Sequence, residues 1–299
     1  MEKKIGFIGL GVMGAPMARL LAAKYGKIVV FDVDSSKMES FRSLNATMAN
    51  GVAEVGKLAD VVFLSLPGSQ VVKEVALGDD GLVSTMREGS VIIDTGTTEP
   101  AVAKEIANAL AAKGISLLDA PVSGGEKAAI EGTLSIMVGG DEQVFADNLE
   151  LLNTMGTAVR VGETGSGQTA KLVNNMIVGA TFAIIAESFA LGVRSGLDPD
   201  TLYQAIRGGW AGSRVLDVAA PAMLGRNFKP GGTVNIHCKD LGYALSLSKE
   251  QDVPLPVTAL VHEIFKAARA AGRGGMSQPA IVTLWENLLG VEVKSATGT

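Results

Sequence analysis

The sequence has very little of what metal sites and disulfide frameworks require. It contains one cysteine, Cys238, and two histidines, His237 and His262. One cysteine excludes an intrachain disulfide, and two distant histidines leave no ligand spacing for zinc, so we predict no bound metal. A single cysteine also suits a reducing compartment, and the first residues lead into a strand pattern with no signal-peptide core. We therefore expect a cytoplasmic protein.

Positive charge and long hydrophobic runs are also scarce. The net charge is -5 and only 19% of residues are charged, with no cluster of Lys and Arg of the kind that binds nucleic acid. No apolar run approaches the roughly 20 residues that span a bilayer. We expect neither nucleic acid nor membrane as a partner. A length of 299 residues with 47% hydrophobic content predicts a globular chain of about two domains.

The first motif lies near the amino terminus, where an apolar strand at 5–8 runs into a glycine-rich turn and then a helical pattern. The turn is a GxGxxG made of Gly9, Leu10, Gly11, Val12, Met13 and Gly14. The next strand, 28–31, ends at Asp32, where a dinucleotide fingerprint expects an acid. Such glycines permit the tight turn, the approach of a pyrophosphate and close helix packing, while the helix N-terminus receives the phosphate charge. We predict that these residues bind a dinucleotide.

Asp32 also bears on which dinucleotide binds. A carboxylate there accepts hydrogen bonds from both ribose hydroxyls and repels a 2'-phosphate, and Val33 rather than an arginine follows it. This favours NAD. NADP is the less favoured alternative, because Lys37 could weaken the discrimination.

Apolar strands continue to recur with helical patterns between them, at 61–66, 91–93, 115–118, 135–138 and 158–161. This alternation predicts an α/β fold with a doubly wound, mainly parallel Rossmann-type sheet, whose ligands bind beyond the carboxyl ends of the strands. At two strand ends, Leu66, Pro67 and Thr97 could line the cofactor. The alternative is that these segments are polar turns with helix caps such as Thr98.

A third strand end, 119–125, carries a serine followed by two glycines. The Ser123 hydroxyl and the backbone N–H groups of Gly124 and Gly125 could form a nest for a substrate carboxylate. The alternative is a flexible loop before the next helix.

Strand patterns stop after Gly162. We predict a hinge at 165–167 and then one long helix, 165–196, which is apolar nearly all round and is therefore expected to be buried. Helical patterns follow at 202–206, 216–224, 239–251, 257–271 and 281–289. The predicted organisation is a nucleotide-binding domain at 1–163, an all-helical substrate and oligomerisation domain at 164–295 in which 164–196 is the interdomain helix, and a tail at 296–299.

Lys171 lies in the first turns of the long helix. A lysine in a buried helix must be paired or functional, and Asn175, four residues on, shares its face. Together they could donate a proton and a hydrogen bond to the alkoxide that develops during carbonyl reduction. Lys239 could reach the cofactor or the substrate, or could form an ordinary surface pair with Asp240.

These motifs, in this order, resemble the beta-hydroxyacid dehydrogenase family along essentially the whole chain. The resemblance rests on the segments 9–14, 119–125, 167–175 and 239–240. It implies that Lys171 is catalytic and assisted by Asn175, that Ser123 and Gly124 hold the substrate carboxylate, and that Thr97 and Lys239 belong to the cofactor site. It also implies a homodimer or homotetramer.

Within the family, the segments 203–213 and 226–231 look most like the 2-hydroxy-3-oxopropionate (tartronate semialdehyde) reductases, with Trp210 as a departure in a loop expected to border the substrate. We therefore expect NAD(P)-dependent reduction of tartronate semialdehyde to glycerate. The alternatives are dehydrogenases of 3-hydroxyisobutyrate or threonate and, less favoured, a sulfolactaldehyde reductase. A different class, an inactive NAD-responsive binding module, is disfavoured because Lys171 is present.

Overall fold

The computed structural model describes residues 3–295 and divides into two compact units, Met1–Lys171 and Leu172–Thr299. The division falls inside the long helix α9 (Ser166–Arg194), eight residues beyond the predicted boundary at 163. The predicted tail, 296–299, lies outside the described residues.

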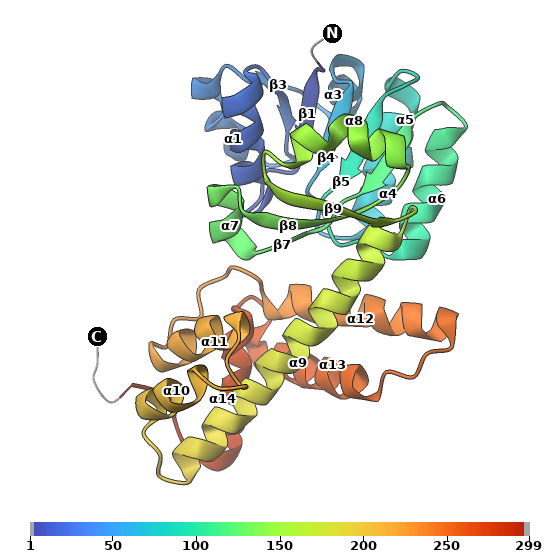
Figure 1. Cartoon of the computed structure of the whole chain (residues 1–299). Helices are drawn as coiled ribbons and strands as arrows, with labels where there is room; N and C mark the ends of the chain where they lie inside the picture. Colours follow the sequence, from blue (N-terminus) through green and yellow to red (C-terminus); the bar gives the residue numbers. More distant parts are fainter. Residues whose placement is uncertain (1–2, 296–299) are drawn as a thin grey trace. The chain divides into compact units, whose positions relative to one another are not determined.

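The amino-terminal unit is built on a nine-stranded sheet (Figure 1). Its strands are β1 (Ile5–Ile8), β2 (Val29–Phe31), β3 (Thr47–Met48), β4 (Val61–Leu64), β5 (Val91–Asp94), β6 (Ser116–Asp119), β7 (Val122–Ser123), β8 (Leu134–Gly139) and β9 (Gly156–Gly162). Its helices are α1 (Gly14–Tyr25), α2 (Ser35–Glu39), α3 (Val52–Leu58), α4 (Ser69–Leu77), α5 (Leu82–Thr85), α6 (Pro100–Ala111), α7 (Gly125–Glu131) and α8 (Glu142–Leu152), with a 3₁₀ turn, η1 (Arg42–Leu44).

The strand order confirms the predicted Rossmann-type sheet. It runs β3-β2-β1-β4-β5-β6-β8-β7, with β9 paired to β8, and the strands from β3 to β6 are all parallel. The order reverses between β1 and β4, which is where such folds bind their ligands. Strand β8 departs from the parallel pattern, since it is antiparallel to both β6 and β7.

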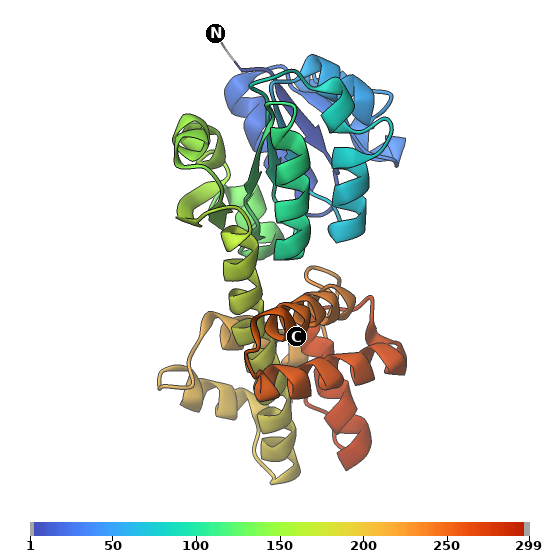
Figure 2. The same cartoon turned by 90° about the vertical axis from the view of Figure 1, so that its right-hand side faces the viewer.

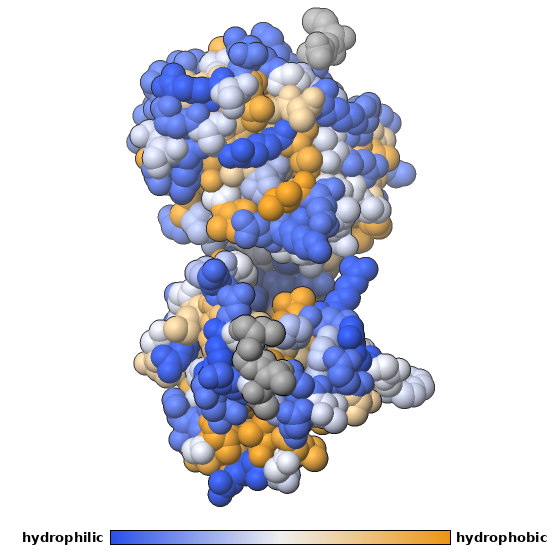
Figure 3. Space-filling model, turned by 90° about the vertical axis from the view of Figure 1, so that its left-hand side faces the viewer, coloured by the Kyte–Doolittle hydropathy of each residue, from blue (hydrophilic) through white to orange (hydrophobic). Residues whose placement is uncertain are grey.

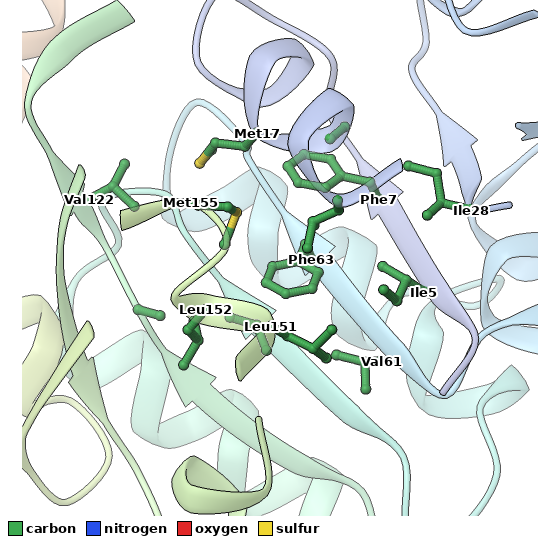
Figure 4. Packing of buried hydrophobic residues seen from close by; sticks show 14 of the residues in the cluster. Ile5, Phe7, Met17, Ile28, Val61, Phe63, Val122, Leu151, Leu152 and Met155 are labelled. Atoms are coloured by element: carbon green, nitrogen blue, oxygen red, sulfur yellow. The ribbon is translucent and has the colours of Figure 1, made fainter. Parts of the chain in front are cut away.

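Alternate residues of the central strands point to opposite faces of the sheet, and each face has its own hydrophobic core. On one face, Phe7 and Phe63 stack with ring centroids 5.9 Å apart beneath residues of α1 and α8 (Figure 4). On the other face, Ile8, Val62 and Leu64 pack with residues of α3, α4 and α6. Figure 2 shows the sheet of this unit with helices on both sides. Burial on both faces explains why these strands read as continuous apolar runs.

The carboxyl-terminal unit is helical, as predicted. Besides most of α9 it contains α10 (Pro199–Arg207), α11 (Arg214–Leu224), α12 (Val234–Gln251), α13 (Pro256–Ala268) and α14 (Val282–Leu289), with a π-helical turn η2 (Arg269–Arg273) and a 3₁₀ turn η3 (Gln278–Ile281). The Asp198 side chain caps α10 by accepting the Thr201 N–H, and Pro199 takes the first helical position. Its core joins Phe182 and Phe189 of α9 to Phe265 of α13.

The prediction that α9 is buried nearly all round is wrong. One face packs into the helical core, but Ile177, Ile184 and Leu191 are 56–65% exposed, and Val173 is 50% exposed. Apolar composition alone could not reveal this, because it does not say how many faces of a helix find partners. Helix α9 is also long and apolar enough to cross a membrane by length and composition alone, contrary to the expectation that no run comes near that length. Its buried face shows it serving as a core helix.

Candidate active site

The glycine-rich turn between β1 and α1 has the geometry that a dinucleotide requires. Gly9 has φ +94, and a Cβ added there would lie 2.3 Å from the Ser65 carbonyl oxygen. A Cβ at Gly14 would lie 1.9 Å from the Gly9 carbonyl oxygen, whereas one at Gly11 meets nothing within 4 Å. Two glycines are thus required by packing, and the third faces open space at the N-terminus of α1. This backbone leaves room for a pyrophosphate to approach the helix.

Asp32, at the end of β2, is tied to the same turn. Its Oδ2 accepts the Leu10 N–H at 2.7 Å, and its Oδ1 accepts the Asp34 N–H at 2.9 Å. Lys37 Nζ lies 3.3 Å from Oδ1. A carboxylate offers about four acceptor positions, so capacity remains for a ribose hydroxyl. The nearby ammonium lowers the negative charge that would repel a 2'-phosphate.

The loops that follow β4 and β5 lie against each other beside the glycine-rich turn. The Thr95 hydroxyl donates to the Leu64 carbonyl at 2.7 Å, and Ser69 Oγ accepts the Glu99 N–H at 3.0 Å. Leu66 and Thr97 are half-buried, while Pro67 is exposed. These three cofactor candidates thus lie on adjoining loops at the carboxyl edge of the sheet.

Thr98 is not the helix cap that the sequence suggested. Helix α6 has Glu99 at its N-cap position, without a side-chain capping bond. The Thr98 hydroxyl instead donates to Asp94 Oδ2 at 2.7 Å, and Thr98 is fully buried. A threonine before a helix reads as a cap, so only the fold reveals this contact.

Ser123 ends the short strand β7, and the two glycines after it have positive φ. The φ of Gly124 is +141 and that of Gly125 is +74. A Cβ at Gly125 would meet nothing within 4 Å, and both glycines are exposed. Left-handed backbone of this kind can turn N–H groups toward an anion. The arrangement fits the predicted carboxylate nest.

The start of α9 is held by Asp119, the last residue of β6. Its Oδ1 accepts the Gly165 N–H and its Oδ2 accepts the Gln168 N–H, both at 2.8 Å. A Cβ at Gly167 would lie 2.3 Å from the Asp119 carbonyl oxygen. The segment 165–167 is therefore a tightly packed junction within the amino-terminal unit, and the hinge expected there stays a prediction.

Burial raises the pKa of Asp119 to about 6, and the N–H bonds to Gly165 and Gln168 only partly oppose this effect. Because the folded pKa exceeds the ordinary value of 3.8, the stability contributed by this group is fully present below about pH 4 and is lost as the pH rises through about 6. The difference corresponds to at most about 3 kcal/mol.

An Asp119→Asn variant should therefore lack this pH dependence. Between pH 4 and pH 7 the wild type should lose about 2 to 3 kcal/mol of unfolding free energy that the variant keeps. Urea denaturation of both proteins at both pH values measures this difference. Asp80→Asn, at an exposed carboxylate, is the control and should show no such change. An Asp119→Asn protein that keeps the wild-type pH dependence would contradict the assignment.

Lys171 and Asn175 both lie on α9, one turn apart, so they share a face. Lys171 is half-buried. Asn175 is buried, and its Nδ2 donates to Asp240 Oδ2 at 2.7 Å while its backbone carbonyl lies 2.9 Å from His237 Nε2. Asn174 Nδ2 donates to Asn175 Oδ1 at 2.9 Å. The Asn175 amide is thus held in one orientation.

Lys239 and Asp240 do not form an ordinary surface pair. Lys239 Nζ lies 3.1 Å from Asp240 Oδ1, but the Asp240 side chain is only 3% exposed and that of Lys239 is 27% exposed. Sequence reasoning missed the structural role of Asp240, which fixes Asn175. The only available signal was the Lys-Asp motif.

Trp210, predicted to bind the substrate, belongs to the carboxyl-terminal unit. It lies between α10 and α11 and is fully exposed. Nothing in the geometry of its own unit shows it lining a site. For metals, residues 3–295 contain no group of three or more His, Cys, Asp or Glu that could hold an ion.

Comparison with known proteins agrees with this geometry. The NAD binding domain of 6-phosphogluconate dehydrogenase matches residues 4–165, and the NAD-binding domain of NADP-dependent 3-hydroxyisobutyrate dehydrogenase matches residues 165–285. The chain is 38% identical to 2-(hydroxymethyl)glutarate dehydrogenase of Eubacterium barkeri, over 98% of this chain and 99% of the relative. It is 37% identical to 2-hydroxy-3-oxopropionate reductase of Escherichia coli K12, over 95% and 97%.

A solved structure is also similar over nearly the whole length. 3-Hydroxyisobutyrate dehydrogenase of Mycobacterium tuberculosis with L-serine has a TM-score of 0.86 and 29% identity, covering 95% of this chain and 99% of that one. The similarity therefore extends over both units of the chain.

Proposed function

Because the chain belongs to the beta-hydroxyacid dehydrogenase family, we propose that its substrate is tartronate semialdehyde, which it reduces to glycerate. The chain is an NAD(P)-dependent dehydrogenase of a small hydroxyacid. Two things support the narrower assignment: the resemblance of segments 203–213 and 226–231 to this group of reductases, and the similarity to the reductase of E. coli.

The compounds named for these relatives, with 2-hydroxy-3-oxopropionate taken as its reduced form glycerate, share one chemical unit. Glycerate, 3-hydroxyisobutyrate, 2-(hydroxymethyl)glutarate and L-serine each carry a carboxylate and a CH₂OH group on the same carbon. They differ only in the third substituent of that carbon, which is OH, CH₃, CH₂CH₂COO⁻ or NH₃⁺. We therefore expect the site to recognise a carboxylate and the hydroxyl or aldehyde oxygen on the β-carbon. The third substituent decides the substrate.

The reaction class, as distinct from the substrate, is also supported by the position of one buried residue in the amino-terminal unit. Asp119 ends β6, four residues before Ser123, and it also holds the first turn of α9, where Lys171 follows. Asp119 thus bonds the helix turn that precedes the proposed proton donor, and the proposed carboxylate nest follows it by four residues in the chain. A fixed spacing between them suits a substrate of one backbone length.

The residues divide the reduction between them. NAD(P)H, held by the 9–14 turn and Asp32, supplies a hydride when bound. Ser123 Oγ and the N–H groups of Gly124 and Gly125 hold the substrate carboxylate. Lys171 donates a proton to the aldehyde oxygen as it gains negative charge, and Asn175 donates a hydrogen bond. In the reverse direction, neutral Lys171 accepts the hydroxyl proton.

The rival substrate is the aldehyde of 2-(hydroxymethyl)glutarate, favoured by the 38% identity to the dehydrogenase of E. barkeri. A panel of glycerate, 3-hydroxyisobutyrate, 2-(hydroxymethyl)glutarate and threonate, assayed with NAD and NADP, separates the candidates. We expect the highest kcat/KM for glycerate. A higher value for the dicarboxylate would overturn the substrate assignment while leaving the reaction class intact.

Cofactor preference gives a further prediction. Replacing Lys37 by Met should sharpen discrimination against NADPH, because the Asp32 carboxylate would lose its neighbouring ammonium. We expect kcat/KM with NADPH to fall about 2- to 5-fold, the effect of a charge pair with one exposed partner, and that with NADH to change less than about 2-fold. Lys57→Met, at another exposed lysine, is the control. Equal losses with both cofactors would show that Lys37 does not discriminate.

We also propose that the chain forms a homo-oligomer. Ile177, Ile184 and Leu191 are spaced seven residues apart along the exposed face of α9, which aligns them as a seam suited to another helix. On the face drawn in Figure 3, hydrophobic side chains also gather at one end of the helical unit. In a two-fold symmetric dimer, the exposed face of α9 in each copy would be covered by the same face of the other copy.

Ile184→Glu is therefore expected to shift sedimentation velocity from an oligomer toward a monomer. Burying an isoleucine contributes about 1.5 to 3 kcal/mol, and a buried carboxylate would oppose association further. Gln204→Glu adds the same charge at an exposed position of α10 and should leave the oligomer intact. A wild-type protein that sediments as a monomer at micromolar concentration would contradict the proposal.

A cytoplasmic location is part of the same proposal. Its support is the single cysteine, Cys238, which is free and buried and therefore suits a reducing compartment. Fractionation of the source cells would test it.

A further inference from the structure

Four polar side chains in the amino-terminal unit are almost wholly inaccessible to solvent. They are Asp94 (2% exposed), Thr98 (0%), Asp119 (0%) and Gln168 (0%). They come from the end of β5, the loop after it, the end of β6 and the first turn of α9. Buried polar groups are retained only where hydrogen bonds compensate for lost solvent. The four are connected, and Gln168 contacts both strand ends.

The Gln168 side chain uses both halves of its amide. Its Oε1 accepts the Thr98 N–H at 2.9 Å. Its Nε2 donates to the Gly96 carbonyl at 3.0 Å and lies 3.4 Å from Asp94 Oδ2. Its backbone N–H donates separately to Asp119. The side chain therefore bonds the residues on either side of Thr97, while the backbone is held by the neighbouring strand.

We propose that Gln168 is a positioning residue, which fixes Lys171 relative to the cofactor loop by clamping the first turn of α9 to residues 96–98. The inference rests on the proposed roles of Lys171 and Thr97. Lys171 follows Gln168 by three residues in an unbroken helix, so a shift of the first turn moves the lysine with it. A misplacement of about 1 Å can cost about 100-fold in rate.

Only an amide fits this position. Glutamate would keep the acceptor for Thr98 but would lose the donor to Gly96 and place a second carboxylate beside Asp94. Methionine has a similar length but lacks both functions. It would leave the Thr98 N–H and the Gly96 carbonyl unsatisfied, without adding charge.

Gln168→Met in the full-length protein tests the proposal. We expect kcat to fall about 10- to 100-fold, while the Kd for NADH, measured by fluorescence, changes less than about 3-fold because the glycine-rich turn and Asp32 are untouched. Without cofactor, hydrogen exchange at the Thr98 amide should become faster. Asn148→Leu is the matched control, since Asn148 is a buried amide of the same unit (1% exposed) that donates to Val144. It should lower stability and leave kcat unchanged.

The outcomes separate this inference from the proposed function. A Gln168→Met enzyme with normal kcat, or with equal losses in kcat and NADH affinity, overturns the positioning role. Equal kcat losses in Gln168→Met and Asn148→Leu would also overturn it, because loss of stability would then explain both. The proposed function is decided separately by Lys171→Ala: if that variant stays active, Lys171 is not the donor, whatever Gln168 does.

Discussion

Lys171→Ala is expected to lower kcat for aldehyde reduction by about 10² to 10⁴, the usual contribution of a general acid. Alanine has a methyl group in place of the lysine side chain, so the proposed proton donor is lost. The negative charge that develops on the aldehyde oxygen would then not be neutralised. The glycine-rich turn and Asp32 are untouched, and NADH should therefore bind with nearly wild-type affinity. Stopped-flow reduction and NADH fluorescence titration measure the two quantities.

The pH dependence provides the control for this result. In the wild type, one group should give opposite pH trends for reduction and oxidation, because reduction needs protonated Lys171 and oxidation needs the neutral amine. Both trends should disappear in the alanine variant, and small primary amines should restore part of its rate. A variant with near-wild-type turnover, or parallel pH trends in the wild type, would contradict the assignment.

Gly14→Ala is expected to have the second large effect, on both folding and cofactor binding. The added Cβ would lie 1.9 Å from the backbone carbonyl of Gly9, and no side-chain rotation can relieve contact with backbone. The turn must open, which should lower the unfolding free energy by about 1 to 3 kcal/mol. Because the turn also shapes the pyrophosphate site, NADH affinity should fall about 100-fold or more, equivalent to about 2.7 kcal/mol.

Gly11→Ala is the matched comparison within the same turn. Its Cβ meets nothing within 4 Å, so thermal stability should be unchanged or slightly higher, as for glycine replaced at an unstrained position. NADH affinity should still fall, because the methyl group would occupy the space through which the cofactor approaches. If Gly11→Ala binds NADH as the wild type does, the cofactor does not approach at this glycine.

Much of the fold was predictable because its strands are buried on both faces. Strands such as β1, β4 and β5 read as short apolar runs that alternate with helical patterns, and the GxGxxG turn places the first of them. Strands β3 and β7 were not predictable, since each has only two residues and depends on a partner distant in sequence. The antiparallel pairing of β8 likewise depends on long-range contacts.

The site was predictable only for residues with a recognisable chemical pattern. A characteristic sequence pattern identifies the glycine-rich turn, Asp32 and the serine-glycine loop as binding segments. Gln168 does not, because a polar residue in the first turn of a helix is unremarkable until the fold buries it. Asp240 was equally hidden, since a carboxylate beside a lysine usually belongs to a solvated surface. Both side chains are buried and make specific hydrogen bonds, and burial can be known only once the chain has folded.

The attachment of α9 to Asp119 has a practical consequence for dissecting the protein. A fragment ending at 163, the domain boundary that the sequence suggests, would retain the Asp119 carboxylate but remove the Gly165 and Gln168 N–H groups that it accepts. A buried carboxylate without its partners destabilises the structure that contains it. An independently expressed nucleotide-binding fragment should therefore continue through the first turns of α9, to Lys171, where the compact unit itself ends.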